Sequence, residues 1–185
     1  NKKENDETKL LNSIIEDSNE NKEDQKDSMN ITLFDNLQFV NSICPGTSYV
    51  DFVKDKLNNN YIIKRLKKDK IMYDKLNNTS IDNSRNFDNE IKSLTKLNNY
   101  NHFPKLLAYE KLPDYKMLMT HCGDMLNKNN LPENWKEQLL EIHNILEKEL
   151  IYHNDTGGVS NICILNNNMT LIDFGESGPN SNYPY

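Results

Sequence analysis

The feature that most constrains this 185-residue sequence is an alternation of short apolar runs and polar clusters near its C-terminus. Residues 150–177 read LIYHNDTGGVSNICILNNNMTLIDFGES, with Asp155 and Asn161 before the apolar runs and Asp173 at their end. The two runs flank three asparagines at positions 166–168, an arrangement typical of two short strands joined by a tight turn. The pattern therefore predicts a small hairpin that carries two carboxylates and an amide at its ends.

Two earlier segments show two different periodicities. In residues 48–68, SYVDFVKDK and YIIKRLKK alternate apolar and polar positions on either side of a turn, LNNN, which predicts a hairpin of half-buried strands. In residues 86–99, apolar residues are spaced by four, three and three, so one helical face carries Phe87, Ile91, Leu94 and Leu97. We therefore expect strands followed by a helix in this part of the chain.

Further elements follow in the second half of the chain. Residues 102–112 and 115–121 predict two strands joined by a turn at Pro113-Asp114. Residues 135–150 predict the strongest helix, whose buried stripe would consist of Leu139, Ile142, Ile145 or Leu146, and Leu150. The polar segment 68–85 predicts a loop that could hold one short helix. Because helices and strands are segregated along the chain, the order of elements favours an α+β fold.

Composition narrows the possible functions. The 22 Lys and Arg residues are outnumbered by 28 Asp and Glu, so the net charge of −6 disfavours a nucleic-acid binder. No apolar run approaches the roughly 18 residues that would span a membrane. Cys44, Cys122 and Cys163 are scattered and form no Cys-x-x-Cys pair, so neither a structural zinc site nor a disulfide framework is indicated. A reducing compartment is therefore expected.

The N-terminal residues 1–29 are acidic, rich in asparagine and poor in apolar side chains, which predicts a disordered, solvated tail rather than a docking motif. The abundance of Asn, Lys and Ile is typical of an AT-rich genome, such as that of a protist or a large DNA virus. We therefore expect an intracellular, cytoplasmic protein, or one packaged in a virion if it is viral.

Taken in order, several segments resemble the motifs of the protein-kinase-like superfamily. YIIKRLKK resembles the strand with the nucleotide-binding lysine, and FDNEIKSL resembles the first large helix with its glutamate. HFPKLLAYE and KMLMTHCGD resemble the next two strands and the hinge, ILEKELIYHND the helix and catalytic loop, and TLIDFGE the Asp-Phe-Gly strand end. The resemblance covers about residues 44–177. It implies a two-lobed fold, with an antiparallel sheet plus helix as N-lobe at 30–119 and a truncated helical C-lobe at 120–185.

The resemblance also implies ATP and magnesium as cofactors. Lys64 would bind the α- and β-phosphates, and Glu90 would orient Lys64 through an ion pair. Gly46 is the one glycine in the segment SICPGTSYVDF, which corresponds to the family's phosphate-covering loop. His121 and Cys122 fall in the hinge, which would place them beside the nucleotide.

Four residues near the C-terminus complete the site that the resemblance implies. Asp173 and Asn161 would be magnesium ligands, because this hard cation prefers oxygen donors. Asp155 would accept or orient the proton of the substrate hydroxyl, and His153 would brace the catalytic loop. Asp155 and Asn161 are six positions apart, where the family has five. Taken singly, each residue also fits an ordinary surface or turn position, so only the ordered set favours a site.

The expected function is phosphoryl transfer to a hydroxyl of a protein or small molecule, as in a minimal Ser/Thr-type kinase. Gly157 stands where Ser/Thr protein kinases carry a lysine, so a small-molecule kinase of the aminoglycoside or choline type remains an alternative. The single Gly46 and the short segment after Gly175 leave a pseudokinase as another. Such a module would bind within a larger assembly, and a protein partner would cover the truncated C-lobe.

Overall fold

The computed structural model describes residues 33–44, 48–66, 72–74, 79–81, 84–111, 115–155 and 159–178. The chain divides into two units, residues 1–35 and residues 36–185. The described residues of the first unit, 33–35, form a helical turn. The tail predicted for residues 1–29 lies outside the described residues.

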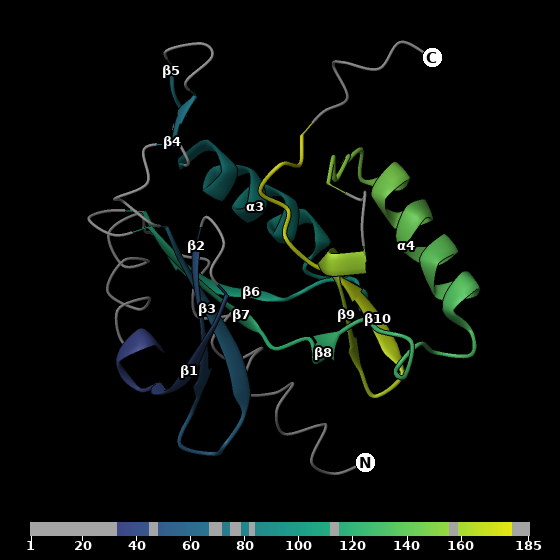
Figure 1. The fold of residues 1–185 in the computed structure, drawn as a ribbon, viewed down its shortest axis with the longest axis horizontal. Helices are drawn as coiled ribbons and strands as arrows, with labels where there is room; N and C mark the ends of the chain where they lie inside the picture. Colours follow the sequence, from purple (N-terminus) through teal and green to yellow (C-terminus); the bar gives the residue numbers. More distant parts are fainter. Residues whose placement is uncertain are drawn as a thin grey trace, which may run out of the picture. The chain divides into compact units, whose positions relative to one another are not determined.

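The main element of the second unit is a five-stranded antiparallel sheet with the strand order β1-β2-β3-β7-β6 (Figure 1). Its strands are β1 (Gln38–Cys44), β2 (Ser48–Lys54), β3 (Asn60–Leu66), β7 (Lys116–Thr120) and β6 (Leu106–Glu110). The hairpin predicted at 48–68 and the two strands predicted within 102–121 are confirmed. The sheet and the two helices below make this unit a mixed α+β structure.

The turn between β2 and β3 sets the register of the central strand. Asp55 accepts hydrogen bonds from two backbone N–H groups of the turn, at 2.8 and 2.9 Å, as short polar side chains commonly do in turns. In the resulting register, Lys64 lies opposite Val50 on one side and Met117 on the other. A one-residue slip would move Lys64 to the other face of the sheet, so this turn helps to position the lysine.

Helix α3 (Ser84–Leu97) follows the predicted amphipathic pattern. Phe87, Ile91, Leu94 and Leu97 are all buried, which confirms the predicted face. Burying a large apolar side chain stabilises the fold by about 1.5–3 kcal/mol relative to leaving it exposed. This face therefore fixes the helix against β6 and β7, whose side chains belong to the same core.

The C-terminal half contains helix α4 (Trp135–Lys148) beside a small antiparallel sheet of β8 (Asp124–Met125), β9 (Ile162–Leu165) and β10 (Asn168–Leu171) (Figure 1). The predicted hairpin is confirmed. Asn166 and Asn167 both have positive φ, at 51° and 65°, as a two-residue turn between right-twisted strands requires. Asparagine tolerates positive φ better than most residues, which explains why this turn is rich in asparagine.

The predicted buried stripe of α4 is partly wrong. Ile142 is buried, and Ile145 and Leu146 pack against the core, but Leu139 is 43 % exposed and Leu150 is 71 % exposed. Leu150 lies past the end of the helix with φ 54°, so its side chain leaves the helical stripe. The buried position next to Leu139 is occupied by a polar residue, Gln138.

Other secondary-structure predictions need correction as well. The segment predicted as a loop contains two paired strands, β4 (Met72–Asp74) and β5 (Thr79–Ile81), and its last two residues, 84 and 85, begin helix α3. β1 and β8 were not predicted. The turn predicted at Pro113-Asp114 lies outside the described residues.

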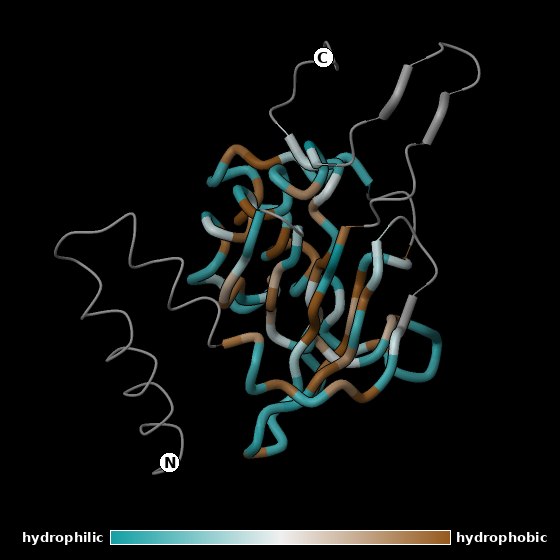
Figure 2. The backbone as a smooth tube through the Cα atoms, turned by 90° about the vertical axis from the view of Figure 1, so that its left-hand side faces the viewer, coloured by the Kyte–Doolittle hydropathy of each residue, from teal (hydrophilic) through white to brown (hydrophobic). Residues whose placement is uncertain are grey.

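One hydrophobic core joins α3, the five-stranded sheet, α4 and the small sheet. Hydrophobic stretches lie along neighbouring strands, whereas the turns are hydrophilic (Figure 2). Phe103 and Phe174 lie at the centre of this core with ring centroids 5.9 Å apart. Residues 36–185 form one unit, so the division into lobes at residue 120 stays a prediction. No helix of the described residues is long and apolar enough to span a membrane.

Candidate functional site

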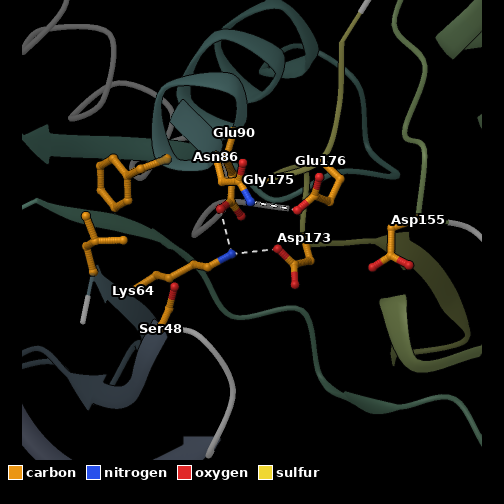
Figure 3. Close-up of a pocket in the computed structure, with 10 residues that line it drawn as sticks. Ser48, Lys64, Asn86, Glu90, Asp155, Asp173, Gly175 and Glu176 are labelled. Carbon is orange, nitrogen blue, oxygen red and sulfur yellow. Dashed lines mark hydrogen bonds and ion pairs between the residues drawn. The ribbon is translucent and has the colours of Figure 1, made fainter. Parts of the chain in front are cut away.

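The Lys64 ammonium connects three distant parts of the chain. Its Nζ lies 2.6 Å from Glu90 Oε2 on α3 and 2.7 Å from Asp173 Oδ1, just after β10 (Figure 3). Burial alone would lower the pKa of Lys64, but the two carboxylates together raise it above its ordinary value. Lys64 is therefore a fixed positive charge at neutral pH.

Glu90 is the buried member of this cluster. Its residue is 2 % exposed, and its carboxylate accepts a hydrogen bond from the Phe174 backbone N–H as well as from Lys64. Burial raises the pKa of Glu90 and the Asp173 charge adds to this rise, while Lys64 opposes it; the net direction is upward. The predicted ion pair between Lys64 and Glu90 is present.

Asp173 is the open member of the cluster. Its side chain is 50 % exposed, and its backbone has φ 63°, in the left-handed region that non-glycine residues seldom adopt. Burial favours a higher pKa for Asp173, but the adjacent Lys64 outweighs it and holds the pKa below its ordinary value. The carboxylate therefore stays ionised, with one oxygen bound to Lys64 (Figure 3).

These side chains line a cavity of about 160 Å³. Asp155 also lines it and lies beyond Asp173 as seen from Lys64 (Figure 3). The polar lining residues are Ser48, Lys64, Asn86, Glu90, Asp155, Asp173 and Glu176. The lining thus contains four carboxylates and one ammonium. Such a cavity favours cations or ligands that carry cations with them.

The loop after α4 is held by hydrogen bonds from the side chains of His153 and Asn161. The buried His153 ring packs against Phe174, with centroids 4.7 Å apart, and its Nε2–H donates to the Ile172 carbonyl at 2.8 Å. Asn161 Nδ2 donates to the backbone oxygen of Asp155 at 2.7 Å and to its Oδ2 at 2.9 Å. The Asp155 carboxylate is therefore exposed, and the buried Asn161 amide holds it in place.

Asp173 and Asn161 are the residues that could hold a metal ion. In the described part of the chain, no group of three or more His, Cys, Asp or Glu side chains is arranged as a complete metal site. Asn161 uses its amide nitrogen on Asp155, which leaves the amide oxygen as a neutral oxygen donor. Magnesium usually takes only one or two protein ligands beside water and phosphate, and both side chains offer the oxygen donors that it prefers. Asp173 lines the cavity but Asn161 does not, so their joint role as magnesium ligands stays a prediction.

Three predicted cofactor-binding residues lie outside this cavity or outside the described structure. Half-buried His121 packs against the Phe52 ring, with centroids 5.0 Å apart, and burial lowers its pKa. Burial raises the pKa of Cys122 to about 12, so it is a neutral thiol. Neither residue lines the cavity around Lys64. Gly46 lies outside the described residues.

The sequence pattern missed three polar residues of the lining: Ser48, Asn86 and Glu176. Asn86 precedes Glu90 by four positions, so it lies on the same face of α3, and that spacing could have found it. Asn86 Nδ2 donates to Glu176 Oε1 at 2.6 Å, which fixes Glu176 at the rim. Ser48 and Glu176 carry no comparable signal.

Comparison of the sequence with models of known protein families and with curated proteins found no match. The kinase-like resemblance thus depends on the ordered sequence motifs.

Proposed function

We propose that residues 36–185 are a protein-kinase-like domain that transfers a phosphoryl group from ATP to a hydroxyl acceptor with the help of magnesium. The observation that carries this proposal is the contact of Lys64 with Glu90, 26 residues away, and with Asp173, 109 residues away. A random ion pair would not select three residues that the ordered motifs also select. In this proposal, residues 30–119 act as the N-lobe and residues 120–185 as a partial C-lobe.

Lys64 and Asp173 have the chemistry to bind a triphosphate and its metal. An ammonium has three N–H donors, and carboxylates occupy two of those on Lys64, so one remains for a phosphate oxygen. Asp173 uses Oδ1 on Lys64, and its half-exposed side chain leaves Oδ2 for a cation. Magnesium bound there would neutralise charge on the phosphates.

Asp155 lies where it would contact the hydroxyl group of the acceptor substrate. Its exposed carboxylate lines the same cavity, and Asn161 supports it through two hydrogen bonds. A hydroxyl that donates to Asp155 would be oriented by an anchored carboxylate rather than by a freely rotating one. General-base or orienting roles of this kind contribute about 10²–10⁴-fold to rate.

A second candidate is a binding module with the same fold and no transfer activity. Exposed leucines on and after α4 favour it: Leu139, Leu140 and Leu150 are 43, 59 and 71 % exposed. Exposed apolar side chains that lie together on one surface often mark a protein interface, and we propose that these three leucines contribute to such a surface. We propose that a protein partner covers this surface in either case.

Magnesium-dependent ATP binding and phosphoryl transfer together test the proposal. We expect ATP to raise the thermal unfolding midpoint only when magnesium is present, and we expect labelled phosphate to reach a hydroxyl acceptor or water. Asp155→Ala should keep ATP binding and reduce transfer at least about 100-fold. Glu147→Ala removes an exposed carboxylate of α4 outside the cavity and serves as the matched control.

The outcomes separate the two candidates. Binding without transfer in the unaltered protein would favour the binding module. No ATP response with or without magnesium would refute the nucleotide site. Acceptor panels of Ser-containing peptides and of amino sugars then distinguish a protein kinase from a small-molecule kinase.

A further inference from the structure

Ser177 is a buried hydroxyl that phosphoryl transfer does not itself require. The residue is 2 % exposed, and its Oγ–H donates to the Phe174 carbonyl, which also accepts from the Ser177 backbone N–H at 3.0 Å. Ser177 Oγ also lies 2.8 Å from Ser93 Oγ on α3. Since the single proton of Ser177 goes to Phe174, Ser93 must donate to Ser177. Both hydroxyls are thereby satisfied in the core.

The turn that Ser177 closes begins next to a strained residue. Asp173 has φ 63°, and a non-glycine residue in this region persists only where the surroundings hold it. The following residues are held at several points: Phe174 is fully buried, and Asn89 Nδ2 donates to the Gly175 carbonyl at 3.3 Å. The Ser93–Ser177 bond fixes the end of the same turn.

Helix α3 holds this turn and Glu90 together. Asn89 and Ser93 are four positions apart on α3 and bind residues 175 and 177, while Glu90 on the same helix binds Lys64 and the Phe174 N–H. The distance between the Glu90 and Asp173 carboxylates is therefore set by one rigid element. Lys64 can bridge both carboxylates only while this distance is kept.

We infer that Ser177 is a positioning residue for Asp173: its hydroxyl ties the Phe174–Ser177 turn to α3 and so keeps the Asp173 carboxylate on Lys64. This inference concerns how the Asp173 carboxylate is kept in place beside Lys64, and its meaning for ATP binding depends on the function proposed above. The substitution Ser177→Ala removes both hydroxyl bonds of this residue. It would let the Asp173 backbone relax from its left-handed conformation.

A double-mutant cycle on magnesium affinity tests the inference. In the unaltered protein, Ser177→Ala should raise several-fold the magnesium concentration that half-saturates ATP binding. In the Asp173→Asn background, the same change should have no further effect, because the residue it positions no longer carries the charge. Equal multiplicative effects in both backgrounds would overturn the inference. Thr95→Ala is the matched control, since among the described residues Thr95 Oγ1 donates to the Ile91 carbonyl of its own helix and to no residue of the Phe174–Ser177 turn.

The same cycle without nucleotide separates this inference from the proposed function. The unfolding midpoint lost on Asp173→Asn should be smaller in the Ser177→Ala background, because the ion pair with Lys64 is already weakened there. Equal losses would overturn the inference even if ATP binds. Unequal losses in a protein that binds no ATP would uphold the positioning role and refute the proposed function.

Ser93→Ala keeps the inference testable if Ser177→Ala fails to fold. This variant removes only the link to α3 and leaves the bond from Ser177 to Phe174. We expect a smaller shift in the same direction in both cycles. A shift of equal size in the Asp173→Asn background would count against the inference.

Discussion

Two regions of residues 36–185 hold their polar residues in opposite ways. At β3 and α3, the anchor is ionic: Lys64 binds the buried Glu90 at 2.6 Å. At α4 and the small sheet, the anchor is a neutral amide: Gln138 donates to the Asn167 carbonyl at 2.9 Å and accepts from the Met169 N–H at 2.7 Å. Both anchors are buried and satisfied, but only the first one responds to pH and to bound ions.

The difference separates the conditions to which each region is sensitive. An ionic anchor loses strength when either partner changes its protonation, and a buried charge left alone is costly. An amide carries no charge, so its hydrogen bonds hold at any pH at which the backbone is folded. The ionic region is therefore the part of the cavity that cations and phosphates can adjust, while the amide region supplies a constant frame for Asp155.

Removing the ammonium should have the largest effect. Lys64→Met leaves Glu90 buried without its partner, and breaking a buried pair in this way typically costs about 3–5 kcal/mol in the free energy of unfolding. The loss should shrink in acid, where Glu90 can take up a proton and become neutral. Urea unfolding at pH 7 and near pH 4.5 measures both effects.

The matched control for this variant also removes the stranded carboxylate. Lys64→Met combined with Glu90→Leu should be more stable than Lys64→Met alone, because no buried charge is left. A double variant less stable than Lys64→Met would mean that the two side chains act by packing. The claim that an ion pair anchors this region would then be wrong.

The neutral anchor gives the second prediction. Gln138→Ala leaves a buried N–H and carbonyl without partners, so it should cost about 1–3 kcal/mol, with little change between pH 5 and 8. Leu139→Ala, at the neighbouring exposed position, should change the free energy of unfolding by less than about 0.5 kcal/mol. Replacing a leucine usually costs more stability than replacing a glutamine, and here we expect the opposite. Urea unfolding of the two variants side by side measures this difference. A larger cost for Leu139→Ala than for Gln138→Ala would instead support the buried stripe of α4 that periodicity predicted, with Leu139 in the core.

Periodicity predicted the fold where each element follows one simple pattern. The face of α3 and the β2–β3 hairpin follow such patterns and were predicted. β1 was missed because its pairing with β2 shifts register twice, between Phe39 and Asn41 and between Ser42 and Cys44, which breaks the alternation. β8 is two residues long and exists through its pairing with β9. No periodic signal can be read from so short a strand.

The candidate site was predictable only in part for a similar reason. Ordered motifs selected Lys64, Glu90 and Asp173, whose contacts the structure contains. Polar residues that act through one partner have no motif: Ser177 is selected only by its bond to Ser93, 84 residues earlier. Contacts between residues so distant in sequence depend on how α3 packs, which local patterns do not specify.

The smallest predicted effect distinguishes the two carboxylates of the ionic region by their pH dependence. The pKa of Asp173 is lowered from 3.8, so its contribution to stability is present above pH 3.8 and is lost as the pH falls through the folded-state pKa. The pKa of Glu90 is raised from 4.5, so its contribution is present below pH 4.5 and is lost as the pH rises through the folded-state pKa. The two carboxylates should therefore give pH profiles of opposite slope.

Asp173→Asn and Glu90→Gln are the matched variants, each compared with the unaltered protein by urea unfolding between pH 2.5 and 7. The stability lost on Asp173→Asn should grow as the pH rises from the most acidic conditions and should reach only about 0.2–1 kcal/mol, because the half-exposed side chain is screened by solvent. The stability lost on Glu90→Gln should instead shrink as the pH rises above 4.5. Parallel profiles would mean that Lys64 sets the pKa of both carboxylates. The burial of Glu90 would then have no separate effect on the pH dependence of stability.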